Sequence, residues 1–225
     1  MDNAARIVLI WIASIAIALH AREAPAQAPS TDSNPVALAI AAELDASMGP
    51  EAPTIHGAGL ALQAPVQEFY SRRGFRPAWS NPDNAAQLRK AIADSYDDGL
   101  NPADYHLPLL EELSGEITQA TATDLLRAQY DVLLTEALLR LAYHLSFGKV
   151  DPETFDPQWN YGRTLARTDI AQKVEQALAA TDISQRVEAL KPTQYLYVEL
   201  KRELARYRAA VSSADSPTIA AGGRL

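Results

Sequence analysis

The chain has 225 residues, of which 48% are hydrophobic and 21% charged, a balance typical of a globular protein and not of a disordered or fibrous one. Its net charge of -8 argues against nucleic acid as a partner, because phosphates require a basic face, and against unaided docking to anionic lipid. The sequence contains no cysteine, which excludes disulfides, thiolate metal sites and a cysteine nucleophile.

Residues 1–28 are typical of an export signal. Arg6 precedes an apolar run from Ile7 to Leu19, and Ala26 and Ala28 are placed for signal-peptidase cleavage. The run has about 13 residues, fewer than the roughly 20 of a spanning helix. We therefore expect a cleaved Sec-type signal peptide, a periplasmic protein and no stable membrane anchor after cleavage. Retention of the segment as an anchor is the alternative.

Residues 29–59 are predicted to form a linker that contains one short helix. Ser33 or Asn34 is a suitable N-cap, and Pro35 suits the first helical position. The apolar residues that follow are mostly small, so this helix is expected to pack lightly. Prolines and glycines without periodicity then predict a loop as far as Gly59.

A second helix is predicted to begin at Pro65 and to end at Gly74. The next five residues, FRPAW, are expected to be extended, because Arg76 precedes a proline and is disfavoured in the helical region. Phe75 and Trp79 are then loop aromatics. They either cap the core or stack on a sugar in a binding groove.

A third helix is predicted to be capped by Asp83 or Asn84, to run to Asp97 and to stop at Gly99. Apolar residues spaced by four predict its buried stripe: Leu88, Ile92 and Tyr96. Asp97 and Asp98 lie at the helix C-terminus, where negative charge is unfavourable. A metal or acid-base role is one interpretation, and a solvated turn is the other.

Asn101 and Pro102 predict a turn before a short helix that ends near Leu113, with Asp104 as its expected N-cap. A long helix follows at 124–147, capped by Thr121 or Thr123 and ended by Gly148. It carries two apolar faces, one of them wider: Val132, Leu134, Ala137, Leu138, Leu139, Leu141, Tyr143 and Leu145.

The two apolar faces of this helix are separated by a polar strip of Glu136, Arg140 and His144. A helix that is apolar on two sides belongs inside a helical domain. We therefore predict an all-α fold, a single multi-helix domain over residues 60–211 that is built around the central helix 124–147.

The loop after the central helix contains two Asp-Pro steps, at Pro152 and Pro157, which favour extended or turn backbone. Together with Gly148 they are predicted to be structural, and to fold Trp159 back over an apolar face of the helix. A surface binding role of Trp159 is the alternative.

Three more helices are predicted after this loop. Thr168 or Asp169 caps the first, and a second begins at Thr181–Asp182 and ends before Pro192. The last runs from Thr193 to about Val211, with an apolar stripe expected to pack: Tyr197, Leu200, Leu204, Tyr207 and Val211. Residues 212–225 are small and polar and predict a linker, which suggests that a longer gene continues beyond it.

No catalytic set is recognisable in the sequence. His20, His56, His106 and His144 lack partners at metal-ligand spacing, so no metal and no cofactor is expected. Serine-hydrolase motifs are missing, and the scattered carboxylates define no glycosidase pair. Glu136 is the best candidate for a perturbed carboxylate, although Arg140 at i+4 is a sufficient structural reason for it.

Four segments after the signal, taken together, carry a family resemblance: VQEFYSRRGFRPAW, DDGLNPADYHL, LLTEALLRLAYHLSFGKVDPETFDPQW and LKPTQYLYVELKRELARY. In this order, over about residues 65–210, they resemble the N-terminal helical scaffold domain of the large periplasmic L,D-transpeptidases. The resemblance implies that a peptidoglycan-binding module and a catalytic domain with a cysteine nucleophile would follow. This sequence has no cysteine, so no catalytic residue is carried over.

Two functional hypotheses follow. The first is a non-catalytic scaffold region of an L,D-transpeptidase-like protein that acts in cell-wall biogenesis, with peptidoglycan or cell-wall proteins as partners. The second is a free-standing periplasmic adaptor whose aromatic loops at Trp79 and Trp159 bind glycan strands or a partner protein. An unrelated helical hydrolase is a third possibility, for which the sequence supplies neither a nucleophile nor an acid pair.

Overall fold

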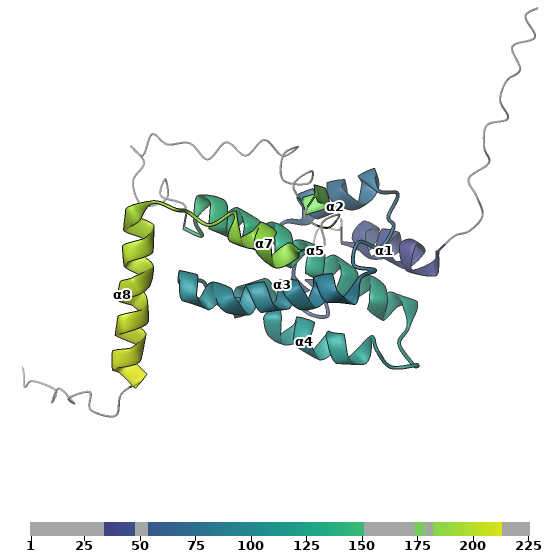
Figure 1. Ribbon diagram of the computed structural model, residues 1–225. Helices are drawn as coiled ribbons and strands as arrows, with labels where there is room; N and C mark the ends of the chain where they lie inside the picture. Colours follow the sequence, from purple (N-terminus) through teal and green to yellow (C-terminus); the bar gives the residue numbers. More distant parts are fainter. Residues whose placement is uncertain (1–33, 48–53, 151–173, 177, 179–181, 213–225) are drawn as a thin grey trace, which may run out of the picture. The chain divides into compact units, whose positions relative to one another are not determined.

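The computed structural model describes residues 34–47, 54–150, 174–176, 178 and 182–212, and every structural statement below concerns these residues. The fold is all-α, as predicted, with one two-stranded hairpin (Figure 1). The elements are α1 (Pro35–Ala46), β1 (Thr54–Ile55), β2 (Ala58–Gly59), α2 (Gln63–Arg72), α3 (Pro82–Asp94), the 3-10 helices η1 (Ser95–Asp98) and η2 (Pro102–Tyr105), α4 (Leu107–Glu116), α5 (Asp124–Phe147), α7 (Ile183–Glu188) and α8 (Tyr195–Ser212).

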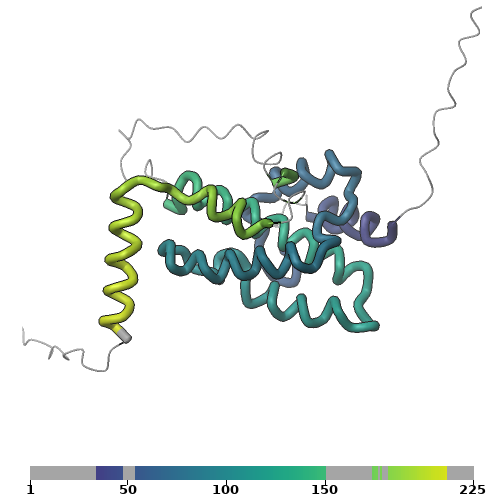
Figure 2. The backbone as a smooth tube through the Cα atoms, in the orientation of Figure 1, coloured from purple at the N-terminus to yellow at the C-terminus, as the bar shows by residue number. Residues whose placement is uncertain are grey.

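The central helix α5 occupies the predicted range. The Thr123 side chain caps it by accepting a hydrogen bond from the backbone N–H of Leu126 at 3.1 Å. Gly148 ends it with φ 82°, which a residue with a Cβ adopts only under strain. Helices α1, α2, α3 and α4 all pack against α5 (Figure 2), and residues on every side of it are buried. The two-sided apolar pattern therefore indicated its central position correctly.

The short helix α1 packs against α5 more closely than its small residues suggested. Asn34 caps it, with the side-chain oxygen accepting from Val36 N–H at 3.0 Å, and Pro35 is its first residue. The prediction of light packing is wrong, because Ile40 and Leu44 are fully buried in the contact with α5. Two large apolar residues one helical turn apart are enough to pack a helix against a core.

The segment predicted as a plain loop before α2 contains an antiparallel hairpin, in which Thr54 pairs with Gly59 and Ile55 with Ala58. His56 and Gly57 make its turn with φ of 50° and 75°. Positive φ at both central positions is the geometry of a two-residue hairpin loop. Two residues per strand are too few for a recognisable alternation in the sequence.

The N-cap of helix α3 lies two or three residues before the predicted one. Asn81, and not Asp83 or Asn84, caps it by accepting from Asp83 N–H at 3.0 Å. The helix tightens into η1 at Ser95 and stops at Gly99, which adopts the predicted left-handed conformation with φ 83°. This tightening turns Tyr96 away from the buried stripe, so its side chain is half exposed.

The turn before α4 also differs from the prediction. Asn101 caps η2, and α4 begins after His106, which adopts a left-handed conformation with φ 59°. Asp104 does not cap α4. It lies within η2, and its carboxylate pairs with Lys149 at 2.5 Å, close to the end of α5.

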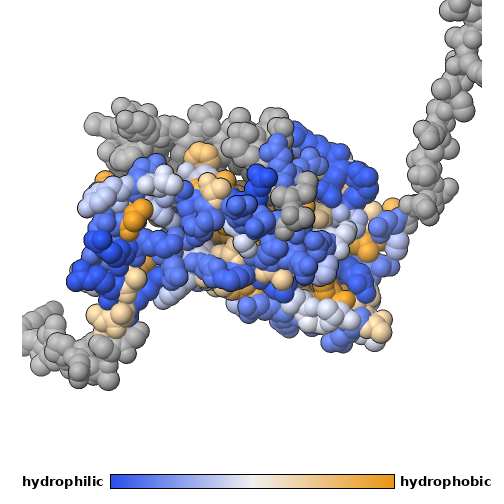
Figure 3. Space-filling view, viewed as in Figure 1, coloured by the Kyte–Doolittle hydropathy of each residue, from blue (hydrophilic) through white to orange (hydrophobic). Residues whose placement is uncertain are grey.

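Helix α8 matches its predicted range, but its apolar stripe does not pack as expected. Tyr197 and Leu204 are half-buried, whereas three other residues of the stripe are largely exposed: Leu200 (69%), Tyr207 (71%) and Val211 (79%). The spacing of apolar residues predicts which face they share, and it does not predict whether that face meets a partner. Elsewhere the face of the molecule seen in Figure 3 is mostly hydrophilic, with small hydrophobic patches.

Some predictions fall outside the described residues. These are the signal peptide, the loop with Pro152, Pro157 and Trp159, the linker 213–225 and most of the helix expected after Asp169, of which residues 174–176 are helical. Asp182 caps α7 as predicted, accepting from Gln185 N–H at 2.8 Å. Among the described helices, none combines the length and the apolar character that a membrane crossing requires.

Candidate functional site

Polar side chains on α5 hold the loops that surround it, and the first of these is Asp131. Its carboxylate is buried and accepts hydrogen bonds from the backbone N–H of Ala78 at 2.9 Å and of Trp79 at 3.0 Å, and from the hydroxyl of Tyr70 at 2.6 Å. Burial raises the pKa of Asp131, although these three donors act to lower it. One carboxylate on the central helix thus fixes the backbone of the loop between α2 and α3.

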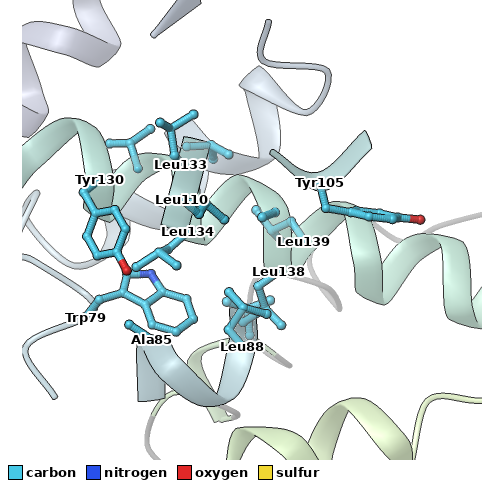
Figure 4. Packing of buried hydrophobic residues seen from close by; sticks show 14 of the residues in the cluster. Trp79, Ala85, Leu88, Tyr105, Leu110, Tyr130, Leu133, Leu134, Leu138 and Leu139 are labelled. Carbon is cyan, nitrogen blue, oxygen red and sulfur yellow. The ribbon is translucent and has the colours of Figure 1, made fainter. Parts of the chain in front are cut away.

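Trp79 belongs to this anchored loop and is part of the core. Its side chain is 8% exposed, and its indole N–H donates to the Thr135 hydroxyl at 2.9 Å. Figure 4 shows the ring among the buried side chains of α3 and α5. Phe75 is half-buried against the same core, but its φ of 57° contradicts the expected extended backbone. Trp79 therefore presents no free face on which a sugar could stack.

One turn further along α5, Glu136 anchors a second set of loops. It is fully buried, and its Oε1 accepts from Arg140 Nε at 2.8 Å and from the backbone N–H of Ala61 at 3.2 Å. Arg140 also donates to the carbonyl oxygens of Asp104 and Gly59. The predicted Glu136–Arg140 pair is thus present, and it ties the hairpin and η2 to the central helix.

Two histidines border this second anchor. His106 Nε2 lies 3.2 Å from Oε2 of Glu136, and His144 Nδ1 is hydrogen-bonded to the Tyr105 hydroxyl at 2.8 Å. Burial lowers the pKa of His144, and the charges of Arg140 and Lys149 lower it further. The polar strip of α5 therefore makes contacts to the surrounding loops, and His144 at its end is half-buried.

Asp98 forms a third anchor, although a solvated turn was one interpretation of this segment from the sequence. Its side chain is only 1% exposed and is surrounded by the hydroxyl of Tyr197 at 2.8 Å, Lys201 Nζ at 2.5 Å and Lys191 Nζ at 2.9 Å. Burial acts to raise the pKa of Asp98, but the hydrogen bonds from Lys191, Lys201 and Tyr197 outweigh it and lower the pKa. This ion cluster, with Arg208 stacked 3.5 Å from the Tyr96 ring, attaches α8 to η1.

The described residues contain no group of three histidine or carboxylate side chains arranged to hold a metal ion. A shallow depression between α3 and α7 is lined mainly by polar side chains that already pair with one another, such as Glu188 with Lys191 and Asp182 with its own helix terminus. What the arrangement can do is hold loops in fixed positions around one helix.

Two of the anchoring carboxylates were not recognised as anchors from the sequence. Asp131 and Asp98 are single carboxylates whose donors lie more than 50 and more than 90 residues away in the chain, respectively. The one available signal was an acidic residue inside an apolar run, as at Asp131 and Glu136, because such a residue is buried only with partners.

Comparison with known proteins assigns the chain to a family. No curated protein and no solved structure matches it. The model of one family, described as the Scaffold domain, matches residues 64–204, which is well over half of the chain and includes α2, α3, α4, α5 and α7 with the first part of α8. The chain belongs to the Scaffold domain family.

Proposed function

We propose that this chain is a non-catalytic scaffold region of an L,D-transpeptidase-like protein, exported to the periplasm, where it positions other modules for peptidoglycan biogenesis. The observation that carries the proposal is the match of residues 64–204 to the Scaffold domain family. The ordered segments quoted from the sequence supply the cell-wall context. The network around α5 is consistent with such a role, because its polar side chains hold the α2–α3 loop, the segment before α2 and η2 at defined positions.

The experiment is an in-frame deletion of residues 60–211 from the chromosomal gene. Peptidoglycan is then isolated, digested with a muramidase and analysed by mass spectrometry for cross-links made by L,D-transpeptidation. We expect this class of cross-link to fall severalfold, while cross-links made by D,D-transpeptidation remain. An unchanged pattern would overturn the proposal, as would cross-linking of purified muropeptides by this chain alone.

The alternative is a free-standing adaptor that binds glycan or a partner protein. Its glycan version relied on stacking by Trp79 and Trp159. Trp79 is buried, and Trp159 lies outside the described residues. The exposed stripe of α8 favours the protein-binding version. A pull-down on purified sacculi separates the two versions, because an adaptor that binds only a partner protein stays in the supernatant.

A further inference from the structure

The end of α2 and the loop between α2 and α3 carry an arginine cluster, which we define as Arg72, Arg73 and Arg76. The chain has a net charge of -8, so three arginines within five residues form a local reversal of sign. Arg72 pairs with Glu68 on α2. Arg73 and Arg76 form no ion pair with any described residue. The charge of Arg73 acts to lower the pKa of the buried Asp131.

The position of the cluster is fixed by the loop itself. Arg73 Nε donates to the Arg76 carbonyl at 2.9 Å, and Arg76 Nε donates to the Arg73 carbonyl at 3.0 Å. Gly74 and Phe75 both have positive φ, which folds the chain tightly between the two arginines. Asp131 then holds the backbone of Ala78. The guanidinium groups are therefore presented by a rigid element.

These internal bonds leave most of the cluster's donors unused. A guanidinium has five N–H donors, and Arg76, which is exposed, uses only Nε within the described structure. Arg73 uses Nε and Nη2, the latter to the Pro77 carbonyl at 3.1 Å. The remaining N–H groups match the paired oxygens of a carboxylate, which arginine binds in a planar, bidentate manner.

We infer that the arginine cluster binds the carboxylates of peptidoglycan stem peptides, an inference that rests on the proposed function. Stem peptides offer several carboxylates along an extended chain, so neighbouring guanidinium groups can be used together. The contact needs no apolar groove and no free aromatic face, in accord with a buried Trp79. The loop that was expected to bind the wall through aromatic rings would bind it through charge.

The test is co-sedimentation of the whole exported chain with purified sacculi. The double variant Arg72→Gln with Arg76→Gln removes two charges and spares Arg73, which lies over the Phe69 ring. The matched control is Arg127→Gln with Arg186→Gln, because these two exposed arginines also form no ion pair with a described residue. Circular dichroism and urea unfolding establish that each variant is folded.

We expect the cluster variant to lose about tenfold in affinity for sacculi and the control variant to bind as the wild type does. Wild-type binding to sacculi should weaken as the salt concentration is raised. A lysine at position 76 (Arg76→Lys) should restore only part of the affinity that glutamine at this position loses, since lysine lacks the paired N–H groups of the guanidinium. Equal losses in the two double variants would overturn the inference, because they would reflect total charge alone. Failure of the wild type to bind sacculi would overturn it as well.

Two further arms identify the ligand. Sacculi whose peptides have been removed by an amidase should no longer bind the chain, and continued binding would indicate glycan recognition and contradict the inference. Soluble muropeptides should displace the chain from sacculi, whereas equal displacement by polyglutamate would show that the cluster does not select stem peptides and would contradict the inference. The deletion of residues 60–211 can reduce the cross-links even when every binding experiment with sacculi contradicts the inference. The proposed function and this inference can therefore fail independently.

Discussion

Helices α5 and α8 are both long and both carry an apolar stripe, yet they differ in what surrounds them. Leu134 on α5 is fully buried, whereas Leu200 on α8 is 69% exposed. Carboxylates on α5 reach outward to hold loops, while α8 is attached to η1 mainly by the ion cluster at Asp98 and the stacking of Arg208. This difference indicates that α5 is the structural centre of the domain and that α8 is a peripheral helix, an arm attached by polar contacts.

The largest expected contrast comes from the same substitution in both helices. Leu134→Ala should lower the free energy of unfolding by about 2–5 kcal/mol, because it leaves a cavity in the core. Leu200→Ala should change it by no more than about 0.5 kcal/mol. Urea unfolding followed by circular dichroism measures both. Similar losses in the two variants would mean that the α8 stripe is buried in solution.

The next largest effect is expected at the anchor of the loop between α2 and α3. Asp131→Ala should lower the free energy of unfolding by about 2–4 kcal/mol, because it leaves the N–H groups of Ala78 and Trp79 and the Tyr70 hydroxyl without their acceptor. Trp79 fluorescence, recorded with Trp11 and Trp159 replaced by phenylalanine, should shift to longer wavelength. Asp97→Ala, at an exposed site, is the control and should be near neutral.

The two buried aspartates should respond to acid with opposite signs. The pKa of Asp98 is lowered in the folded protein. Its contribution to stability is therefore present at pH values above its pKa in the unfolded chain, and it is lost as pH falls through its pKa in the folded protein. The pKa of Asp131 is raised in the folded protein, so ionisation of Asp131 opposes folding. The stability of the protein therefore decreases as pH rises from the pKa of Asp131 in the unfolded chain through its pKa in the folded protein.

Unfolding curves between pH 2 and pH 7 test these signs. The loss of stability caused by Asp98→Asn should be greatest at neutral pH and should disappear towards pH 2. The stability of Asp131→Asn relative to the wild type should instead rise as pH increases through the folded pKa. A pH-independent effect of Asp98→Asn would show that its ion cluster does not form in solution.

The smallest effect is expected from the charged face of α8. Arg206 pairs with Glu203 at 2.8 Å, and both side chains are well exposed. Arg206→Ala should therefore change the free energy of unfolding by no more than about 0.5 kcal/mol. A loss above 1 kcal/mol, measured in the same urea assay, would indicate that this face is covered.

The sequence predicted those parts of the fold that depend on local pattern. The bounds of α5 followed from its two apolar faces, Thr123 and Gly148, and the stop at Gly99 followed from the need for a left-handed residue. Local pattern could not locate Asp98 or Asp131 in their clusters, because their partners come from distant parts of the chain. It also could not show that the α8 stripe stays exposed, since periodicity carries no information about a neighbour.

The central claim is that α5 is the stable centre of the domain and α8 an arm attached by polar contacts. Native-state hydrogen exchange of the purified chain, resolved by residue, tests it most directly. The account predicts that amides from Val132 to Leu141 exchange only through global unfolding, and that amides from Glu203 to Val211 exchange through local opening at much lower free energy. Equal protection of the two helices, or local opening of α5, would contradict it.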